Sequence, residues 1–152
     1  MLLFDLPLGL DRYEFEMPDL ITLHQASTHF PIGLLLTSVF CEVVGAIWKN
    51  ASGFRTTGFW TLILGTISAA ASTALGWFGN PWRFKHNAMA QSIEVHKWWG
   101  VAALVIFVLL TIWRIARPQK RGRLETAIYA FLTLLGVVVI SLTGYMGGHA
   151  GE

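Results

Sequence analysis

The stretch HFPIGLLLTSVFCEVVGAIW, residues 29–48, decides the class of fold, because a polar segment gives way here to an almost uninterrupted apolar run. A transmembrane helix needs about 20 mostly apolar residues. The run over residues 31–48 meets that need, and three later runs match it at 57–78, 98–113 and 126–146. The sequence therefore predicts four membrane-spanning helices.

The composition of the whole chain agrees with this prediction. Of its 152 residues, 54% are hydrophobic and only 13% are charged, which is too apolar for a soluble domain of this size. Short loops join neighbouring spans in antiparallel fashion, so we expect an all-α membrane protein with an up-down-up-down four-helix bundle. Residues 29–149 would form this transmembrane domain, and the acidic residues 1–28 an extramembrane N-terminal tail.

Basic residues beside the spans predict the orientation, because Lys and Arg are retained on the cytoplasmic side. Those near the first and third loops between spans outnumber those on the opposite side. The first group is Lys49, Arg55, Arg114, Arg117, Lys120, Arg121 and Arg123, and the second is Arg12, Arg83, Lys85 and Lys97. Both termini are therefore expected on the periplasmic side. Topology and lipid headgroups account for the basic loops, so no nucleic-acid partner is expected.

The histidines all fall on the outer side in this topology, although they are scattered along the chain. They are His24, His29, His86, His96 and His149. Two of them open spans in the same His-x-x-x-Gly frame, as HFPIG at 29–33 and HKWWG at 96–100. The matching hairpins also close alike, with GWFG at 76–79 and GYMG at 144–147. The pattern predicts two similar hairpins related by a pseudo-twofold axis along the membrane normal.

This repeat predicts a shared site between the first and third spans. His29 and His96 would project toward each other across the bundle, close enough to ligate one metal ion. Residues i and i+4 share a helix face, so Gly33 and Gly100 would leave a flat space below the two imidazoles. A haem b with His29 and His96 as axial ligands fits such a space. Two histidine ligands favour electron transfer, because no coordination position stays open.

Other readings of the same residues remain open. A single histidine at a membrane boundary often only bonds a loop carbonyl or water, and small-residue faces often serve helix packing. The chain could then be a non-redox accessory subunit of a membrane complex. A copper or zinc site is a further alternative, with ligands drawn from His24, His29, Met146 and His149, while His86 reads as a surface residue. Glu42, inside the first span, is expected to pair with Arg114 or Arg55.

No motif for an independent enzyme is present: the sequence offers no phosphate-binding loop, no nucleophile with its base, and no cysteine pair. An electron carrier or subunit is the more natural expectation, with a larger membrane redox complex or a periplasmic cytochrome c as partner.

The segments LHQASTHFPIG at 23–33 and GYMGGH at 144–149, with His96 opening the third span, resemble the bacterial membrane family DUF2231. The resemblance covers residues 23–149. It implies a four-span protein of the bacterial inner membrane. Members of that family tend to occur fused or adjacent to cytochrome c and iron-sulfur modules, which implies a role in respiratory or photosynthetic electron transfer.

Overall fold

The computed structural model describes residues 19–48, 50–79, 88–117 and 122–149. Within these ranges the protein is helical and contains no strand. The helices are α1 (Leu20–Ser27), α2 (His29–Ile47), α3 (Ser52–Phe78), α4 (Ala88–Ala116) and α5 (Arg123–His149). Four stretches among the described residues are long and apolar enough to cross a membrane: Leu20–Ile47, Ser52–Phe78, Ser92–Ala116 and Arg123–His149. The predicted all-α, four-span class of fold is confirmed.

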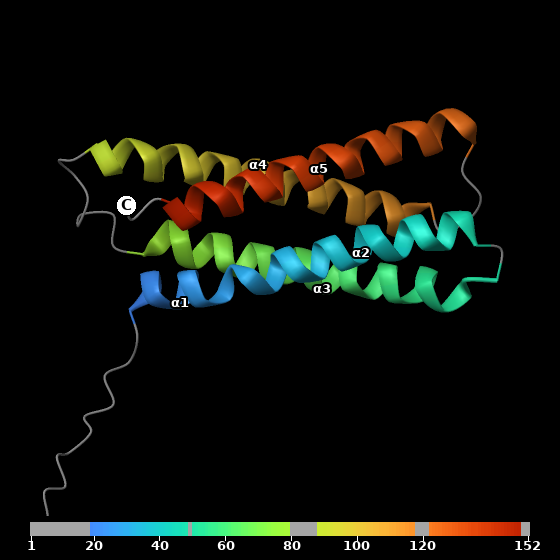
Figure 1. Cartoon of the computed structure of the whole chain (residues 1–152), viewed down its shortest axis with the longest axis horizontal. Helices are drawn as coiled ribbons and strands as arrows, with labels where there is room; N and C mark the ends of the chain where they lie inside the picture. The colour runs from blue at the N-terminus through green and yellow to red at the C-terminus, as the bar shows by residue number, and fades with distance from the viewer. Residues whose placement is uncertain (1–18, 49, 80–87, 118–121, 150–152) are drawn as a thin grey trace, which may run out of the picture.

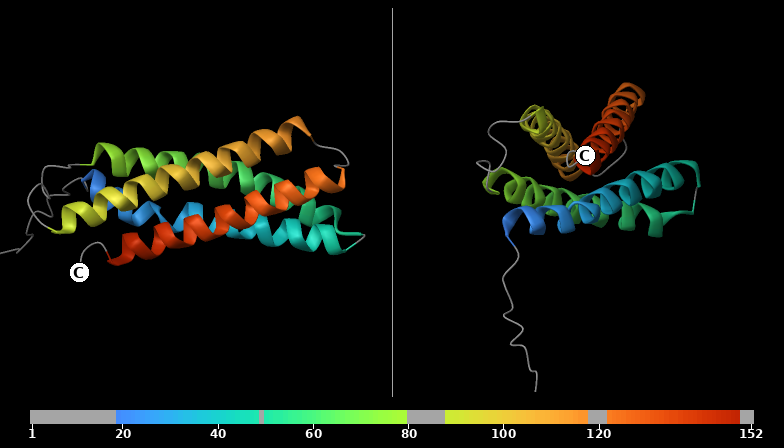
Figure 2. Two further views of the ribbon diagram at one scale, coloured as in Figure 1. Left: turned by 90° about the horizontal axis from the view of Figure 1, so that it is seen from above. Right: turned by 60° about the vertical axis from the view of Figure 1, so that its left-hand side comes forward.

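The helices are arranged as two hairpins (Figure 1). One hairpin pairs α2 with α3, and the other pairs α4 with α5; α1 continues the line of α2 and packs mainly against α3. Figure 2 shows the second hairpin lying across the first, with α4 next to α3 and α5 next to α2. The site described below lies between the two hairpins.

The first span starts at Leu20, earlier than the apolar run alone predicts. Asp19 caps α1, since its carboxylate accepts a hydrogen bond from the Thr22 amide at 2.7 Å. The helix is interrupted at Thr28, just before Pro31. Proline has no N–H to donate to the carbonyl four residues earlier, that of Ser27, so the helical ladder breaks there. The break divides the span into α1 and α2.

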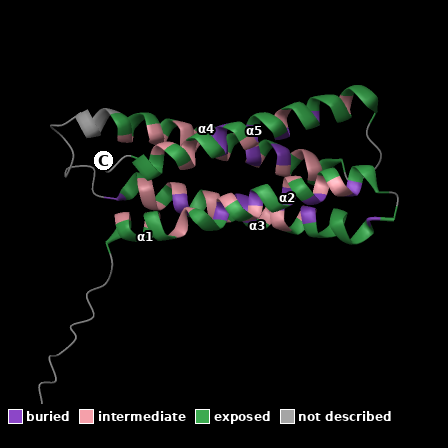
Figure 3. Cartoon of the chain, viewed as in Figure 1, coloured by how far each residue is buried: buried purple, intermediate pink, exposed green. Residues whose placement is uncertain are grey.

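The core lies where the two hairpins meet. Leu35 of α2 and Phe107 of α4 are both 0% exposed, and buried residues of α3 and α5 surround them. The outward faces carry large exposed apolar side chains, such as Ile67 and Phe131, at more than half exposure. Figure 3 shows exposed residues along the outer sides of all the helices. An apolar exterior around a packed interior is what a lipid-embedded bundle requires.

An internal repeat relates the two hairpins. Leu35 packs so closely on Gly65 that a Cβ there would lie 2.7 Å from Leu35 Cδ2, and Phe107 packs on Gly136 with a corresponding 3.1 Å. Phe107 follows Leu35 by 72 residues, the separation that also joins Glu42 to Arg114. In the returning helices α3 and α5, equivalent residues such as Gly65 and Gly136 are 71 residues apart in sequence. The two hairpins therefore place equivalent residues at their shared interface.

Candidate functional site

The imidazoles of His24 and His96 face each other between the two hairpins. Their ring centroids lie 6.1 Å apart with an angle of 65° between the ring planes. His24 belongs to the short helix α1 and His96 to α4, near the end of the bundle where α3 and α5 finish. Both side chains are half-buried. His96 follows His24 by the same 72 residues as in the core, so the two rings occupy equivalent positions of the repeat.

Each ring is oriented by a backbone carbonyl of the returning helix in its own hairpin. His24 Nδ1 lies 2.8 Å from the Ser72 carbonyl oxygen, and His96 Nδ1 lies 3.1 Å from the Thr143 carbonyl oxygen. A carbonyl can only accept a hydrogen bond, so each Nδ1 carries the proton and donates it. In a neutral imidazole the proton on Nδ1 leaves the lone pair on Nε2. Both histidines are therefore held in the same tautomer.

The half-site at His24 has an additional layer of hydroxyl groups. Ser72 Oγ lies 3.3 Å from His24 Nδ1 and 3.3 Å from Ser27 Oγ. The Ser27 hydroxyl is also 2.9 Å from the His24 carbonyl oxygen, to which it donates. At the other half-site the Thr143 hydroxyl instead donates to the Val139 carbonyl at 2.8 Å. Two serine hydroxyls thus support His24, whereas among the described residues the Thr143 hydroxyl plays no such part at His96.

The two Nε2 atoms are the chemically available atoms of this site. Across residues 19–48, 50–79, 88–117 and 122–149, the structure records no hydrogen bond to either Nε2. A metal-binding histidine commonly donates its second ring N–H to a carbonyl, which fixes the tautomer and the direction of the ligating nitrogen. His24 and His96 both have this arrangement. The pair is suited to donate two nitrogen lone pairs to one shared ligand.

Aromatic side chains border the site. Trp77 of α3 and Trp98 of α4 meet edge to face with centroids 6.1 Å apart, and the Lys97 ammonium lies 4.7 Å from the Trp77 ring centroid. Trp98 Nε1 donates to Glu94 at 3.1 Å. Tryptophan side chains with a polar tip are typical of the membrane–water boundary. These tryptophans lie at the end of the bundle where the paired histidines are.

The structure places the predicted ligand His29 elsewhere. His29 is exposed, and the ring that faces His96 belongs to His24. The repeat register based on the two His-x-x-x-Gly frames is therefore wrong, because it equates His29 with His96. His24 and His29 are five positions apart in a helical segment. Their side chains therefore point about 140° away from each other around the helix axis.

The predicted glycines below the rings are not close to them. Gly33 is exposed, and a Cβ there would meet nothing within 4 Å; a Cβ on Gly100 would only touch Thr143 Cγ2 at 3.8 Å. The glycines that do contact the imidazoles are Gly76 and Gly147, one on the returning helix of each hairpin.

His149 and Met146 are the other candidate ligands among the described residues. His149 is exposed, with Nδ1 bonded to the Tyr145 carbonyl at 2.9 Å and its ring 4.3 Å from the Tyr145 ring. Met146 is half-buried on α5, and His86 lies outside the described residues. Among the residues that the structure describes, no group of three or more His, Cys, Asp or Glu side chains could hold a metal ion.

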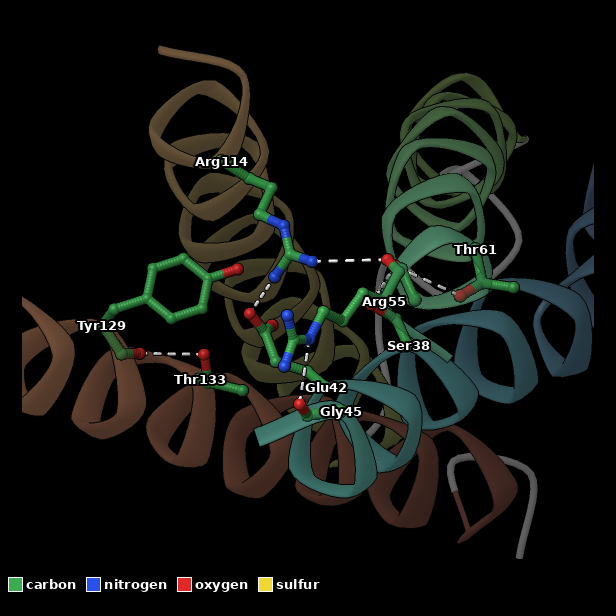
Figure 4. Close-up of polar contacts among 9 residues, drawn as sticks. Ser38, Glu42, Gly45, Arg55, Thr61, Arg114, Tyr129 and Thr133 are labelled. Carbon is green, nitrogen blue, oxygen red and sulfur yellow. Dashed lines mark hydrogen bonds and ion pairs between the residues drawn. The ribbon is translucent and has the colours of Figure 1, made fainter. Parts of the chain in front are cut away.

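The expected ion pair within the membrane is confirmed at the opposite end of the interface. Arg114 of α4 donates through Nη1 to the Glu42 carboxylate of α2, and through Nη2 to the Arg55 carbonyl at 3.4 Å (Figure 4). The Arg55 side chain lies across Gly45 and donates through Nε to its carbonyl at 3.0 Å. This cluster ties α2, α3 and α4 together.

Ser72 and Thr143 are the residues of the site that the sequence did not predict, while Gly76 and Gly147 were noted only within the hairpin ends GWFG and GYMG. A common pattern links them: a hydroxyl residue followed by glycine four positions later, in STALG at 72–76 and TGYMG at 143–147. The ion pair offered a second signal, since the separation from Glu42 to Arg114 equals that from His24 to His96.

Comparison with known protein families identifies a match over most of the chain. The sequence model of a family described as "Predicted membrane protein (DUF2231)" matches residues 20–151. No curated protein and no solved structure matches the chain. The matched segment includes all four spans and both facing histidines. The chain belongs to the DUF2231 family of predicted membrane proteins.

Proposed function

We propose that this protein is a membrane electron-transfer subunit that binds one haem b between His24 and His96. The observation that carries the proposal is the pair of facing imidazoles at equivalent positions of the repeat, both with the proton on Nδ1. Two identical donors at equivalent positions of the repeat suit a single ligand that binds the same group on both sides. In the ion pair, by contrast, the equivalent positions hold opposite charges.

The two imidazoles suit one shared metal. Metal–imidazole bonds are about 2 Å long, so two rings whose centroids lie about 6 Å apart could both bind the same ion. The observed separation is 6.1 Å. Neutral imidazoles with a free Nε2 are the form that haem iron binds, and a bound haem would supply one-electron chemistry. His24 and His96 would hold it, and the Ser72 and Thr143 carbonyls would keep both rings aligned.

The place of the site suggests the kind of partner. Both histidines lie near one end of the bundle, so a donor or acceptor docked at that surface could approach them closely. By the distribution of basic residues this surface faces the periplasm of a bacterial inner membrane, with both termini on the same side. We propose a periplasmic cytochrome c or a larger membrane redox complex as the partner.

A visible spectrum tests the proposal. Protein purified from haem-replete cells should show a Soret band and a b-type pyridine haemochrome, and electron paramagnetic resonance should show two histidine ligands. Replacing His24 or His96 with Ala should abolish the band. The matched control is His29→Ala, which should keep it, since that side chain is exposed. A band that survives His24→Ala and disappears with His29→Ala would overturn the assignment.

A bare metal ion is the second candidate, because the same two Nε2 lone pairs suit copper or zinc. Metal analysis of the purified protein separates the cases. Stoichiometric copper or zinc without a Soret band would favour this candidate. A colourless, metal-free protein that co-purifies with a membrane complex would instead favour an accessory, non-redox role.

A further inference from the structure

Each facing imidazole packs against a glycine of the returning helix in its own hairpin. A Cβ added to Gly76 would lie 2.9 Å from His24 Cε1 and 3.0 Å from Nδ1, and a Cβ added to Gly147 would lie 2.8 Å from His96 Cε1. Real Cβ atoms essentially never approach other atoms this closely. Any larger residue at either position would therefore push the imidazole aside.

The two glycines act together with the two carbonyls. Gly76 lies four residues after Ser72, and Gly147 four residues after Thr143, so each pair shares one helix face. The carbonyl accepts the Nδ1 proton while the glycine leaves room for the Cε1 edge of the same ring. Hydrogen bonding fixes one ring nitrogen, and the close approach fixes how far the ring lies from the helix. The direction of Nε2 follows from these two constraints.

We infer that Gly76 and Gly147 are positioning residues of the site: they let each imidazole lie close enough to its helix to reach the carbonyl, and so they help to set the direction of both Nε2 atoms. The inference rests on the proposed function in that a shared ligand would use those atoms. The contacts themselves involve only residues of the chain. A close-packing role alone would not require the same carbonyl-and-glycine arrangement under both rings. Gly65 and Gly136 illustrate plain packing, because they accommodate Leu35 and Phe107.

Nuclear magnetic resonance of protein with ¹⁵N-labelled histidine tests this inference in nanodiscs, without haem. The unmodified protein should show His24 and His96 with protonated Nδ1 and unprotonated Nε2. It should also show close contacts from His24 Hε1 to Gly76 Hα and from His96 Hε1 to Gly147 Hα. Gly76→Ala should change the His24 signals only, and Gly147→Ala the His96 signals only.

Gly148→Ala is the matched control, since a Cβ there meets nothing within 4 Å. It should leave both histidines unchanged. Equal spectra for Gly147→Ala and Gly148→Ala would overturn the inference, as would missing contacts between the histidine and glycine protons of the unmodified protein. The latter measurement needs no variant, so it decides the matter even if Gly76→Ala or Gly147→Ala fails to fold.

The haem-loaded protein provides a second readout. Gly76→Ala and Gly147→Ala should each shift the low-spin resonance signals or lose the second axial ligand, while Gly148→Ala keeps them. If the unmodified protein binds no haem but shows the paired Nδ1–H tautomers and both glycine contacts, the proposed function fails and the positioning role of the glycines stands. If it binds haem and the glycine variants match the control, the proposed function stands and the positioning role of the glycines fails.

Discussion

Glu42 and Arg114 form an ion pair between equivalent positions of the two hairpins, 72 residues apart in sequence. The side chains are 24% and 17% exposed, so the pair is largely shielded. Figure 4 shows Arg114 reaching from α4 to the carboxylate on α2, with the Arg55 side chain close by. Equivalent positions of the repeat carry opposite charges here. The resulting ion pair joins the two hairpins.

Removing either member of this pair should destabilise the protein. Glu42→Gln and Arg114→Gln should each cost roughly 3 kcal/mol, because the remaining charge stays shielded from water without its partner. The charge-exchanged variant Glu42→Arg with Arg114→Glu should recover most of the loss, since the two positions are equivalent. Denaturant unfolding in detergent measures all three. Glu94→Gln, an exposed position, is the control, and a double variant no more stable than the single ones would contradict the expected equivalence.

Leu35 and Gly65 should show strong coupling in a double-mutant cycle. Leu35→Ala should cost about 2 to 5 kcal/mol through the cavity it leaves. Gly65→Ala should destabilise for the opposite reason, because its Cβ would lie 2.7 Å from Leu35 Cδ2. In the double variant the new methyl group occupies part of the cavity, so the combined cost should fall well below the sum of the two. Additive costs would mean that the two residues do not share this space.

Acidification should weaken metal binding at the paired histidines. A proton competes with the metal for each Nε2, so the affinity for added Zn²⁺ should fall by about tenfold per pH unit for each ring that has become protonated. Two charged rings at 6.1 Å would also repel each other. Calorimetric titration of the haem-free protein at several pH values measures the effect. His29→Ala should follow the same pH curve, and binding that does not change with pH would exclude imidazole ligands.

Loss of the hydroxyl layer should affect only one half of the site. Ser72→Ala keeps the carbonyl that accepts the His24 proton but removes the hydroxyl 3.3 Å from Nδ1 and the partner of Ser27. The tautomer of His24 should persist, with a faster exchange of its Nδ1 proton, and His96 should not change. Histidine ¹⁵N spectra distinguish the two rings. An effect of the same size on His96 would show that the hydroxyl acts on the whole interface.

The sequence predicted the features that depend on apolar run length and charge. These include the four spans, the all-α class of fold and an ion pair between Glu42 and one of two arginines, Arg114 or Arg55. It did not predict which histidine faces His96. The visible frame around His29 and Gly33 resembles that around His96 and Gly100, but contacts across helices decide the pairing, and these depend on Ser72 and Thr143 far along the chain. Aligning the two hairpins on Glu42 and Arg114 would have paired His24 with His96. Two charges that must meet inside a membrane constrain the register more strongly than a short sequence match does.

The position of His24 and His96 at one end of the bundle also has an electrical consequence. The fully buried Leu35 and Phe107 lie between the paired imidazoles and the other end, where Arg114 meets Glu42. A charge that crosses the whole bilayer exchanges about 2.3 kcal/mol with each 100 mV of membrane potential. A charge delivered to the imidazoles from the nearer surface passes through only a small part of that voltage drop. Its arrival and departure would therefore exchange little energy with the membrane potential.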